Sequence, residues 1–294
     1  MGVEKKNTVS RWKPWIIYGV GIVFYCYAYL LRVYPGIFSH SIKYHLHIES
    51  NAVVFGWLAA MYYVIYAPLQ VPVGVCVDKV GPRWSLITAC AVALLGCYLF
   101  AISDSVGISM IGRMLVGFGA AFSYVTALKL ASMWLPKRYF ATATGAVTAL
   151  GMTAAAVSYN VQTKTIGVDA YHAVMMAPVF IGLVVLALVV FLVRNRQVST
   201  EVAEDAEESS AVSFAQLWSF LGKIVLSRQL WLIGLIGCFL YIPSSVFLDV
   251  YAKRYLMSVH GLSAAQAGIG IFLMFLGWII SSLATGSLSD YIRK

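Results

Sequence analysis

Charge is scarce in this sequence of 294 residues. Asp, Glu, Lys and Arg make up only 11% of it, whereas 61% of the residues are hydrophobic and the mean hydropathy is +0.81. A soluble domain carries charge on about a quarter of its residues. The sequence therefore predicts a membrane protein. Its length sets the number of spans rather than the number of globular domains, because each spanning helix needs about 20 apolar residues.

Motifs for disulfides, metals and catalysis are also lacking. The five cysteines form no CxxC pair and fall in apolar runs or at their cytoplasmic ends, so neither a disulfide nor a metal site is expected. No Ser-His-Asp set, paired carboxylates or phosphate-binding loop is evident, and we expect neither an enzyme nor a cofactor. His40, His45 and His47 have a spacing that suits a metal or a pH sensor, but loop histidines are mostly solvated.

The basic residues do not gather as they would on a nucleic-acid-binding surface. The net charge is +9, but the lysines and arginines stand singly at the ends of apolar runs and are not mixed with stacking aromatic residues. Nucleic-acid-binding proteins concentrate such residues on one face or along one helix. A nucleic-acid partner is therefore not expected.

Apolar windows predict eight transmembrane helices. They cover residues 15–36, 53–75, 84–103, 107–134, 139–162, 170–193, 228–256 and 263–288. With a cytoplasmic N-terminus, 14 of the 21 lysines and arginines lie on the inner side, and only Lys43, Lys164, Lys253 and Arg254 lie on the outer side. This positive-inside bias predicts that the N-terminus is cytoplasmic.

The composition changes sharply after the sixth predicted span. The stretch "RNRQVSTEVAEDAEESSAVS" contains five acidic residues and few apolar ones, which predicts a solvated cytoplasmic segment. A flexible tether is the simpler interpretation, and a partner-binding tail is the alternative. We therefore expect a six-helix bundle at 1–193, a linker at 194–227, and two further spans at 228–294.

The stretch "VPVGVCVDKVGPRWSL" interrupts the apolar pattern between the second and third spans. Glycine and proline suit a tight turn, and we expect a cytoplasmic loop of roughly eight residues. Asp78 can accept hydrogen bonds from a helix N-terminus or pair with a cation, and Lys79 and Arg83 can hold acids or lipid phosphates. An ordinary positively charged loop is the alternative.

This stretch resembles the signature loop of the major facilitator superfamily, G-x-[apolar]-x-D-[RK]-x-G-[RKP]-[RK]. The matching residues are Gly74, Asp78, Lys79, Gly81, Pro82 and Arg83. A partial second copy, "GSLSDYIRK", places Gly286 and Asp290 after the eighth span. The resemblance implies two six-helix halves related by an internal repeat.

Further segments are similar to the same family. The fourth span reads R-x-x-x-G-x-G-A from Arg113, and "WLPKRYFATATG" resembles the loop into span five, although Phe140 stands where many members have arginine. The segments "FYCYAYLLRVYPGIF" and "GWLAAMYYVIYAPLQVPVG" look most like the phagosomal-transporter (Pht-like) branch of intracellular bacteria. That branch is associated with uptake of amino acids and nucleosides. Members have twelve spans, so we expect a truncated product or a fragment.

Arg32 is the strongest candidate for binding a substrate, because it lies deep in the first span, where a charge facing lipid is costly. In related organic-anion transporters an arginine at this place holds a phosphate or carboxylate, and here Leu31 replaces the neighbouring acid. Anchoring at the outer interface, by lipid or Glu49, is the alternative. In the second span Tyr62, Tyr66 and Gln70 recur every four residues and share a helix face, which suits either substrate binding or helix packing.

Other polar residues within spans are weaker candidates. Arg113 can orient neighbouring helices, Tyr124 can face a cavity, and Lys129 can face the cavity or snorkel to the cytoplasmic side. Asn160 suits substrate binding or packing at the outer mouth. The seventh span adds Tyr241 and Ser244 in a proline-broken helix, together with Asp249, which can carry a proton or pair with Lys253.

These observations favour a secondary transporter of the bacterial inner membrane that imports a small metabolite by alternating access. An amino acid is the expected substrate, and a nucleoside or an organic anion or phosphate is the alternative. A non-transporting remnant or membrane assembly partner is the alternative class, because four spans are missing. We expect a monomer whose partners are membrane lipids and a small-molecule substrate.

Overall fold

The computed structural model describes residues 12–162, 171–194, 226–242, 247–248 and 251–292. These residues form helices and no strands. The helices are α1 (Lys13–Ile37), α2 (Ser39–His45), α3 (Ala52–Val80), α4 (Pro82–Ile102), α5 (Val106–Trp134), the 3-10 turn η1 (Lys137–Tyr139), α6 (Phe140–Gln162), α7 (Tyr171–Leu192), α10 (Arg228–Ile242), α11 (Ala252–Val259) and α12 (Ala264–Ile292).

Seven of the described helices are long and apolar enough to cross a membrane. They correspond to the predicted spans one to six and eight. The seventh prediction, at 228–256, falls on the shorter apolar helix α10, on α11, and on the positions 243–246 and 249–250, which lie outside the described residues. Most of the predicted linker, residues 195–225, also lies outside them.

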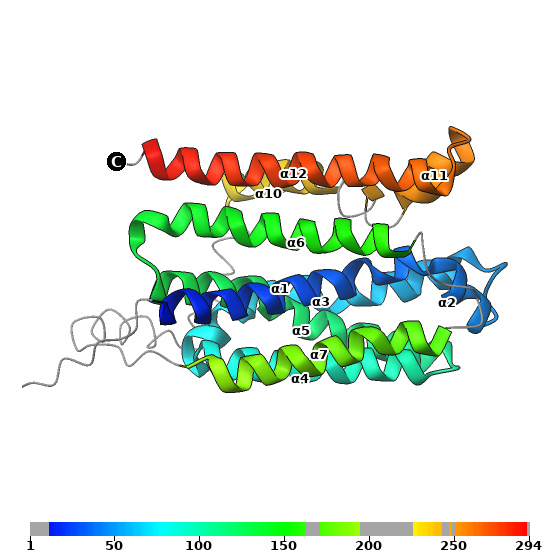
Figure 1. The fold of residues 1–294 in the computed structure, drawn as a ribbon, viewed down its shortest axis with the longest axis horizontal. Helices are drawn as coiled ribbons and strands as arrows, with labels where there is room; N and C mark the ends of the chain where they lie inside the picture. The colour runs from blue at the N-terminus through cyan, green and yellow to red at the C-terminus, as the bar shows by residue number, and fades with distance from the viewer. Residues whose placement is uncertain (1–11, 163–170, 195–225, 243–246, 249–250, 293–294) are drawn as a thin grey trace, which may run out of the picture.

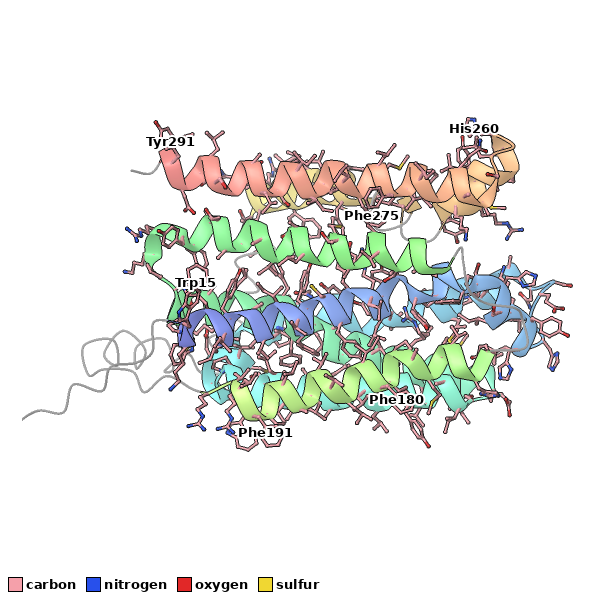
Figure 2. The ribbon with its side chains drawn as sticks, in the orientation of Figure 1. Trp15, Phe180, Phe191, His260, Phe275 and Tyr291 are labelled. Carbon is pink, nitrogen blue, oxygen red and sulfur yellow. The ribbon has the colours of Figure 1, made fainter. Side chains whose placement is uncertain are left out.

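The long helices run side by side in one bundle (Figure 1). Helix α5 lies at its centre and packs against α1, α3 and α4, while α7 covers α4, and α12 lies along α6. Figure 2 shows that Phe275 points from α12 towards α6, where it is fully buried, whereas Phe180 and Phe191 point away from the bundle and are exposed. An exposed apolar rim of this kind suits contact with acyl chains.

The expected eight-residue cytoplasmic loop is wrong. Helix α3 continues through Asp78 and Lys79 to Val80, and α4 begins at Pro82, so Gly81 alone joins the two helices. The helix extends past the apolar window because Val77 is buried in the bundle, and its packing stabilises one more helical turn. Gly81 has φ 85°, a left-handed conformation that glycine adopts without a Cβ penalty, and Pro82 suits the first turn of the next helix.

The connection between α1 and α3 also differs from the expected outer loop. Residues Ser39–His45 form the short helix α2, whose Ile42 is fully buried. A single buried apolar residue in a polar stretch gives little periodicity, so the sequence carried only a weak signal for this helix. His45 is its last residue, and His47 follows with φ 55°.

Helices α6 and α12 approach each other closely at a seam of small residues. A Cβ on Gly145 would lie 2.5 Å from the carbonyl oxygen of Ser282, and a Cβ on Gly286 would lie 2.8 Å from the carbonyl oxygen of Ala141. Glycine is therefore required at both positions. Small residues allow such backbone contact between helices in membranes, and the seam joins the first six spans to the last helix of the chain.

Candidate functional site

Arg32 lies deep in the bundle and bridges α1 to α10. Its side chain is only 8% exposed, and its Nη1 donates a hydrogen bond of 2.6 Å to the hydroxyl of Tyr241. The guanidinium also lies 5.0 Å from the ring centre of Tyr29 and 5.6 Å from that of Tyr63. Aromatic faces stabilise a cation that has left water. The anchoring alternative at the outer interface does not describe this position, because the charge faces the protein interior.

A cavity of about 240 Å³ opens beside Arg32. Six helices contribute to it, and its lining contains one arginine, six tyrosines and no acidic residue among the described positions. The lining residues are Tyr25, Ala28, Tyr29 and Arg32 of α1, Tyr62 and Tyr66 of α3, Ala120, Ser123 and Tyr124 of α5, Thr148 and Met152 of α6, Tyr241 of α10 and Trp278 of α12.

The tyrosines hold one another in place around the cavity. The rings of Tyr62 and Tyr66 are stacked with their centres 5.3 Å apart, and Tyr25 contacts Tyr124 at 5.5 Å. The hydroxyl of Tyr29 donates to the sulfur of Met152 at 3.1 Å. Such contacts fix the rings by packing, so the cavity is a shaped and largely aromatic site with a few polar groups, as small-molecule sites commonly are.

Arg113 does not line this cavity but contacts residues next to it. Its Nη1 donates a 2.8 Å hydrogen bond to the carbonyl oxygen of Leu31, next to Arg32, and its guanidinium lies 5.1 Å from the ring centre of Tyr62. Arg113 is 4% exposed. A side chain of α5 therefore positions both α1 and the ring of an α3 tyrosine.

A second, larger cavity, the outer cavity, lies at the end of the bundle that the sequence predicts to face outward. It measures about 650 Å³, and its described lining includes Lys43, Lys253, Arg254 and His40 against one acid, Glu49. The ammonium of Lys43 lies 4.7 Å from the ring centre of Phe55. Partial burial and, secondarily, the positive charge of Arg254 lower the pKa of Lys43. This outer cavity therefore gathers positive charge from α2 and α11.

The structure brings together five of the residues that the sequence singled out. Arg32, Tyr62, Tyr66, Tyr124 and Tyr241 all line the central cavity. Gln70, two turns beyond Tyr62 on α3, does not line it, and Lys129 pairs with Asp78 near the end of α3. The side chain of Asn160, together with Ser244 and Asp249, lies outside the described residues.

Sequence reasoning missed several cavity residues. Tyr25 and Tyr29 precede Arg32 by seven and three positions, a spacing that places all three on one face of α1, so this signal was present in the sequence. Thr148, Met152 and Trp278 gave no such signal. They reach the cavity only because α6 and α12 pack beside α1 and α5.

The sequence matches the family described as the Major Facilitator Superfamily over residues 17–294. The chain belongs to this superfamily. It is also 22% identical over 289 residues to a protein of Cupriavidus necator (strain ATCC 17699 / DSM 428 / KCTC 22496 / NCIMB 10442 / H16 / Stanier 337) named "Probable sulfoacetate transporter SauU". That alignment covers 95% of this chain and 65% of the relative.

The superfamily signature at residues 74–83 forms a helix end with an ion pair. Asp78 Oδ1 lies 2.7 Å from Lys129 Nζ of α5, and both side chains are about 40% exposed. Gly74 lies within α3, Lys79 is exposed, and Arg83 donates a long hydrogen bond of 3.4 Å to the carbonyl oxygen of Val190 in α7. The motif thus ties α3 to α5, and α4 to α7.

The second copy of the signature caps a helix. Asp290 of α12 accepts hydrogen bonds from the backbone amides of Ala141, at 3.2 Å, and Thr142, at 2.7 Å, and from the Thr142 hydroxyl. These two amides lie in the first turn of α6, where no carbonyl within the helix can satisfy them. Asp290 therefore caps the N-terminus of α6, while Asp78 pairs with the ammonium group of Lys129.

Proposed function

We propose that this chain acts within a secondary transporter that carries a small organic anion, with Arg32 holding the anionic group. The observation that carries this proposal is the buried guanidinium of Arg32, which lines the central cavity from deep within the first span. Charged side chains that face the interior of a membrane bundle mark substrate pathways. A planar guanidinium matches carboxylate, sulfonate or phosphate oxygens with two parallel donors.

An anion, which was one of the alternatives from the sequence, fits this lining better than the expected amino acid or the alternative nucleoside. A zwitterionic amino acid also brings an ammonium group, for which the described lining offers tyrosine faces and hydroxyls but no carboxylate. An uncharged nucleoside would offer the guanidinium only neutral acceptors, whose hydrogen bonds are weaker than those of an anion. The volume of about 240 Å³ further favours a small substrate.

The outer cavity supports the same choice of substrate. Lys43, Lys253 and Arg254 outnumber the single acid Glu49 in its described lining. A cavity lined by one sign of charge raises the local concentration of ions of the other sign and speeds their encounter. The relative's name points the same way, because sulfoacetate carries a carboxylate and a sulfonate.

The mechanism we propose is alternating access in a bacterial inner membrane, with a monomeric protein whose N-terminus is cytoplasmic. The first six spans would rock against the C-terminal helices around the cavity, as transporters with internal repeats do. Arg32 and Tyr241 lie on opposite sides of that division. An anion that competes with Tyr241 for the guanidinium would therefore bias the arrangement of the two parts.

Counterflow in proteoliposomes tests this proposal on the 294-residue chain. Vesicles preloaded with sulfoacetate are given labelled sulfoacetate outside, and unlabelled acetate, phosphate, alanine, glycine and uridine compete. Accumulation that organic anions suppress and alanine and uridine do not is the expected result. Stronger suppression by alanine and glycine than by the anions would indicate an amino acid as the substrate. If no labelled solute accumulates, whichever solute is preloaded, transport by this chain is overturned.

A further inference from the structure

Three potential metal ligands meet at the outer end of the bundle, away from both cavities. They are His45 at the end of α2, Asp104 in the link between α4 and α5, and His172 in the first turn of α7. One donor atom of each lies within 4.8 Å of the donor atoms of the other two. His45 Nε2 is already 2.9 Å from Asp104 Oδ1.

Neighbouring groups fix the orientation of both imidazoles. The ring of His45 stacks on Tyr171 with centres 3.8 Å apart and planes inclined by 13°. His172 Nδ1 lies 3.2 Å from the carbonyl oxygen of Ala101. A carbonyl can only accept, so this contact suits the neutral tautomer that carries its proton on Nδ1 and offers the Nε2 lone pair to a ligand. Metal-bound histidines are held in this way, with the other ring nitrogen donating to a backbone carbonyl or carboxylate.

The electrostatics of this corner favour a cation. Helix α4 ends at Ile102, and the carbonyl oxygens of Phe100 and Ala101 in its last turn point to Tyr171 and His172. The C-terminal end of a helix carries partial negative charge. The carboxylate of Asp104 follows directly, with 84% of its side chain exposed. An ion from solution can therefore reach the group without opening the bundle.

We propose that His45, Asp104 and His172 form a binding site for a divalent transition-metal ion of the zinc class. Two imidazoles and one carboxylate suit zinc, nickel or copper rather than magnesium or calcium, which prefer oxygen ligands. Three protein ligands leave a fourth position for water. Ligand atoms on a tetrahedral zinc ion lie roughly 3.3 Å apart, so the group must contract, which the exposed Asp104 and His172 side chains allow.

The site would brace the outer end of the first six spans. Its ligands come from α2, from the link after α4, and from α7, so one ion ties together three segments that the chain connects only through long helices. None of the ligands lines the central cavity. The inference is therefore independent of the proposed transport activity.

Metal binding to the purified 294-residue chain tests the proposal. After treatment with EDTA, zinc affinity is measured by competition with a chromophoric chelator, and cobalt is added to record the visible absorption of a four-coordinate ion. We expect one equivalent to bind tightly and magnesium not to compete. His45→Asn, Asp104→Asn and His172→Gln should each weaken binding by about tenfold or more, whereas His40→Gln and His47→Asn should leave it unchanged.

The control variants decide whether binding is specific. His40 lies in the first turn of the same short helix and His47 follows its end, and asparagine tolerates the left-handed backbone at position 47. Equal losses in the controls, or no stoichiometric binding by the wild type, would overturn the site. Asp104 is exposed, so Asp104→Asn keeps the test decisive even where a histidine variant lowers the melting temperature of the metal-free protein.

Discussion

Arg32 of the first span donates its Nη1 hydrogen bond to the hydroxyl of Tyr241, 209 positions further along the chain. This contact joins α1 to α10 across the cavity that both residues line. This side-chain hydrogen bond therefore connects the proposed anion site with the C-terminal segment. The next two predictions concern its two partners.

Tyr241→Phe removes the acceptor and keeps the ring. A hydrogen bond to a charged group contributes about 1.5–3 kcal/mol when buried, and because Tyr241 is 41% exposed we expect a loss nearer 1 kcal/mol. Thermal unfolding in detergent measures it, with Tyr291→Phe at the exposed end of α12 as control. A melting temperature equal to that of the control variant would show that the bond does not stabilise this arrangement.

Arg32→Lys keeps the charge but loses the planar fork. If the guanidinium holds an anionic group, affinity should fall by about 1–3 kcal/mol, while thermal stability falls by no more than the loss of about 1 kcal/mol expected for Tyr241→Phe. Ligand-induced thermal stabilisation across organic anions, phosphates, amino acids and nucleosides measures the change. Arg138→Lys in the exposed turn η1 is the matched control, and equal ligand-induced shifts in the two variants would move the binding role to Tyr62 and Tyr66.

Asp78→Ala and Asp290→Ala alter the corresponding aspartates of the two signature copies and should differ in their effect on stability. Asp78 forms a half-exposed ion pair, which contributes about 0–1 kcal/mol, so Asp78→Ala should change stability little. Asp290 caps two amides of α6, and replacing a capping residue by alanine costs about 0.5–2 kcal/mol. Thermal unfolding of both variants and of Lys129→Gln compares them; a larger loss of stability for Asp78→Ala would contradict this ranking.

Arg254→Gln and Glu49→Gln change the charge of the outer cavity in opposite directions. We expect the first to lower and the second to raise the initial rate of anion uptake, each by about twofold or more at low salt, because the cavity concentrates anions. The difference should vanish near 1 M salt, where the Debye length is about 3 Å. Rates that move in the same direction in both variants would argue against steering by charge.

Cysteine labelling tests the proposed orientation. The exposed native thiols are Cys76 and Cys238, so they are first replaced by Ser and Ala. In that background Glu49→Cys should react with an impermeant maleimide from outside the cell, and Lys79→Cys should react only after permeabilisation. Both parent side chains are exposed. Rapid outside labelling at position 79 would invert the topology.

The sequence predicted well what depends on local periodicity. Apolar windows located the long helices, and the four-residue spacing of Tyr62 and Tyr66 placed them on one face that does line the cavity. Burial of Arg32 followed from the cost of a charge in a span. The limits of α3 were wrong because its last turn is stabilised by packing of Val77 rather than by an apolar run.

Residues that come together only in the tertiary structure could not be grouped from the sequence. Lys43 and Arg254 meet only because α2 and α11 lie at the same end of the bundle, and His45 meets His172 because α7 returns along α4. The partner of Asp290 could not be predicted from its motif, and for Asp78 the sequence left a helix N-terminus and a cation as alternatives, of which the structure shows the cation, Lys129. Pairwise distances between remote segments carry this information, and no single window of the sequence contains it.

The glycine seam between α6 and α12 has a consequence for the lipid around the protein. With the backbones of Gly145 and Gly286 in near contact, no gap wide enough for an acyl chain remains between the two helices there. Thr148 of α6 and Trp278 of α12 continue the same pair of helices into the wall of the polar cavity. The seam thus excludes acyl chains from the wall of the cavity between α6 and α12. A methyl group added at either glycine would push the two helices apart and weaken this exclusion.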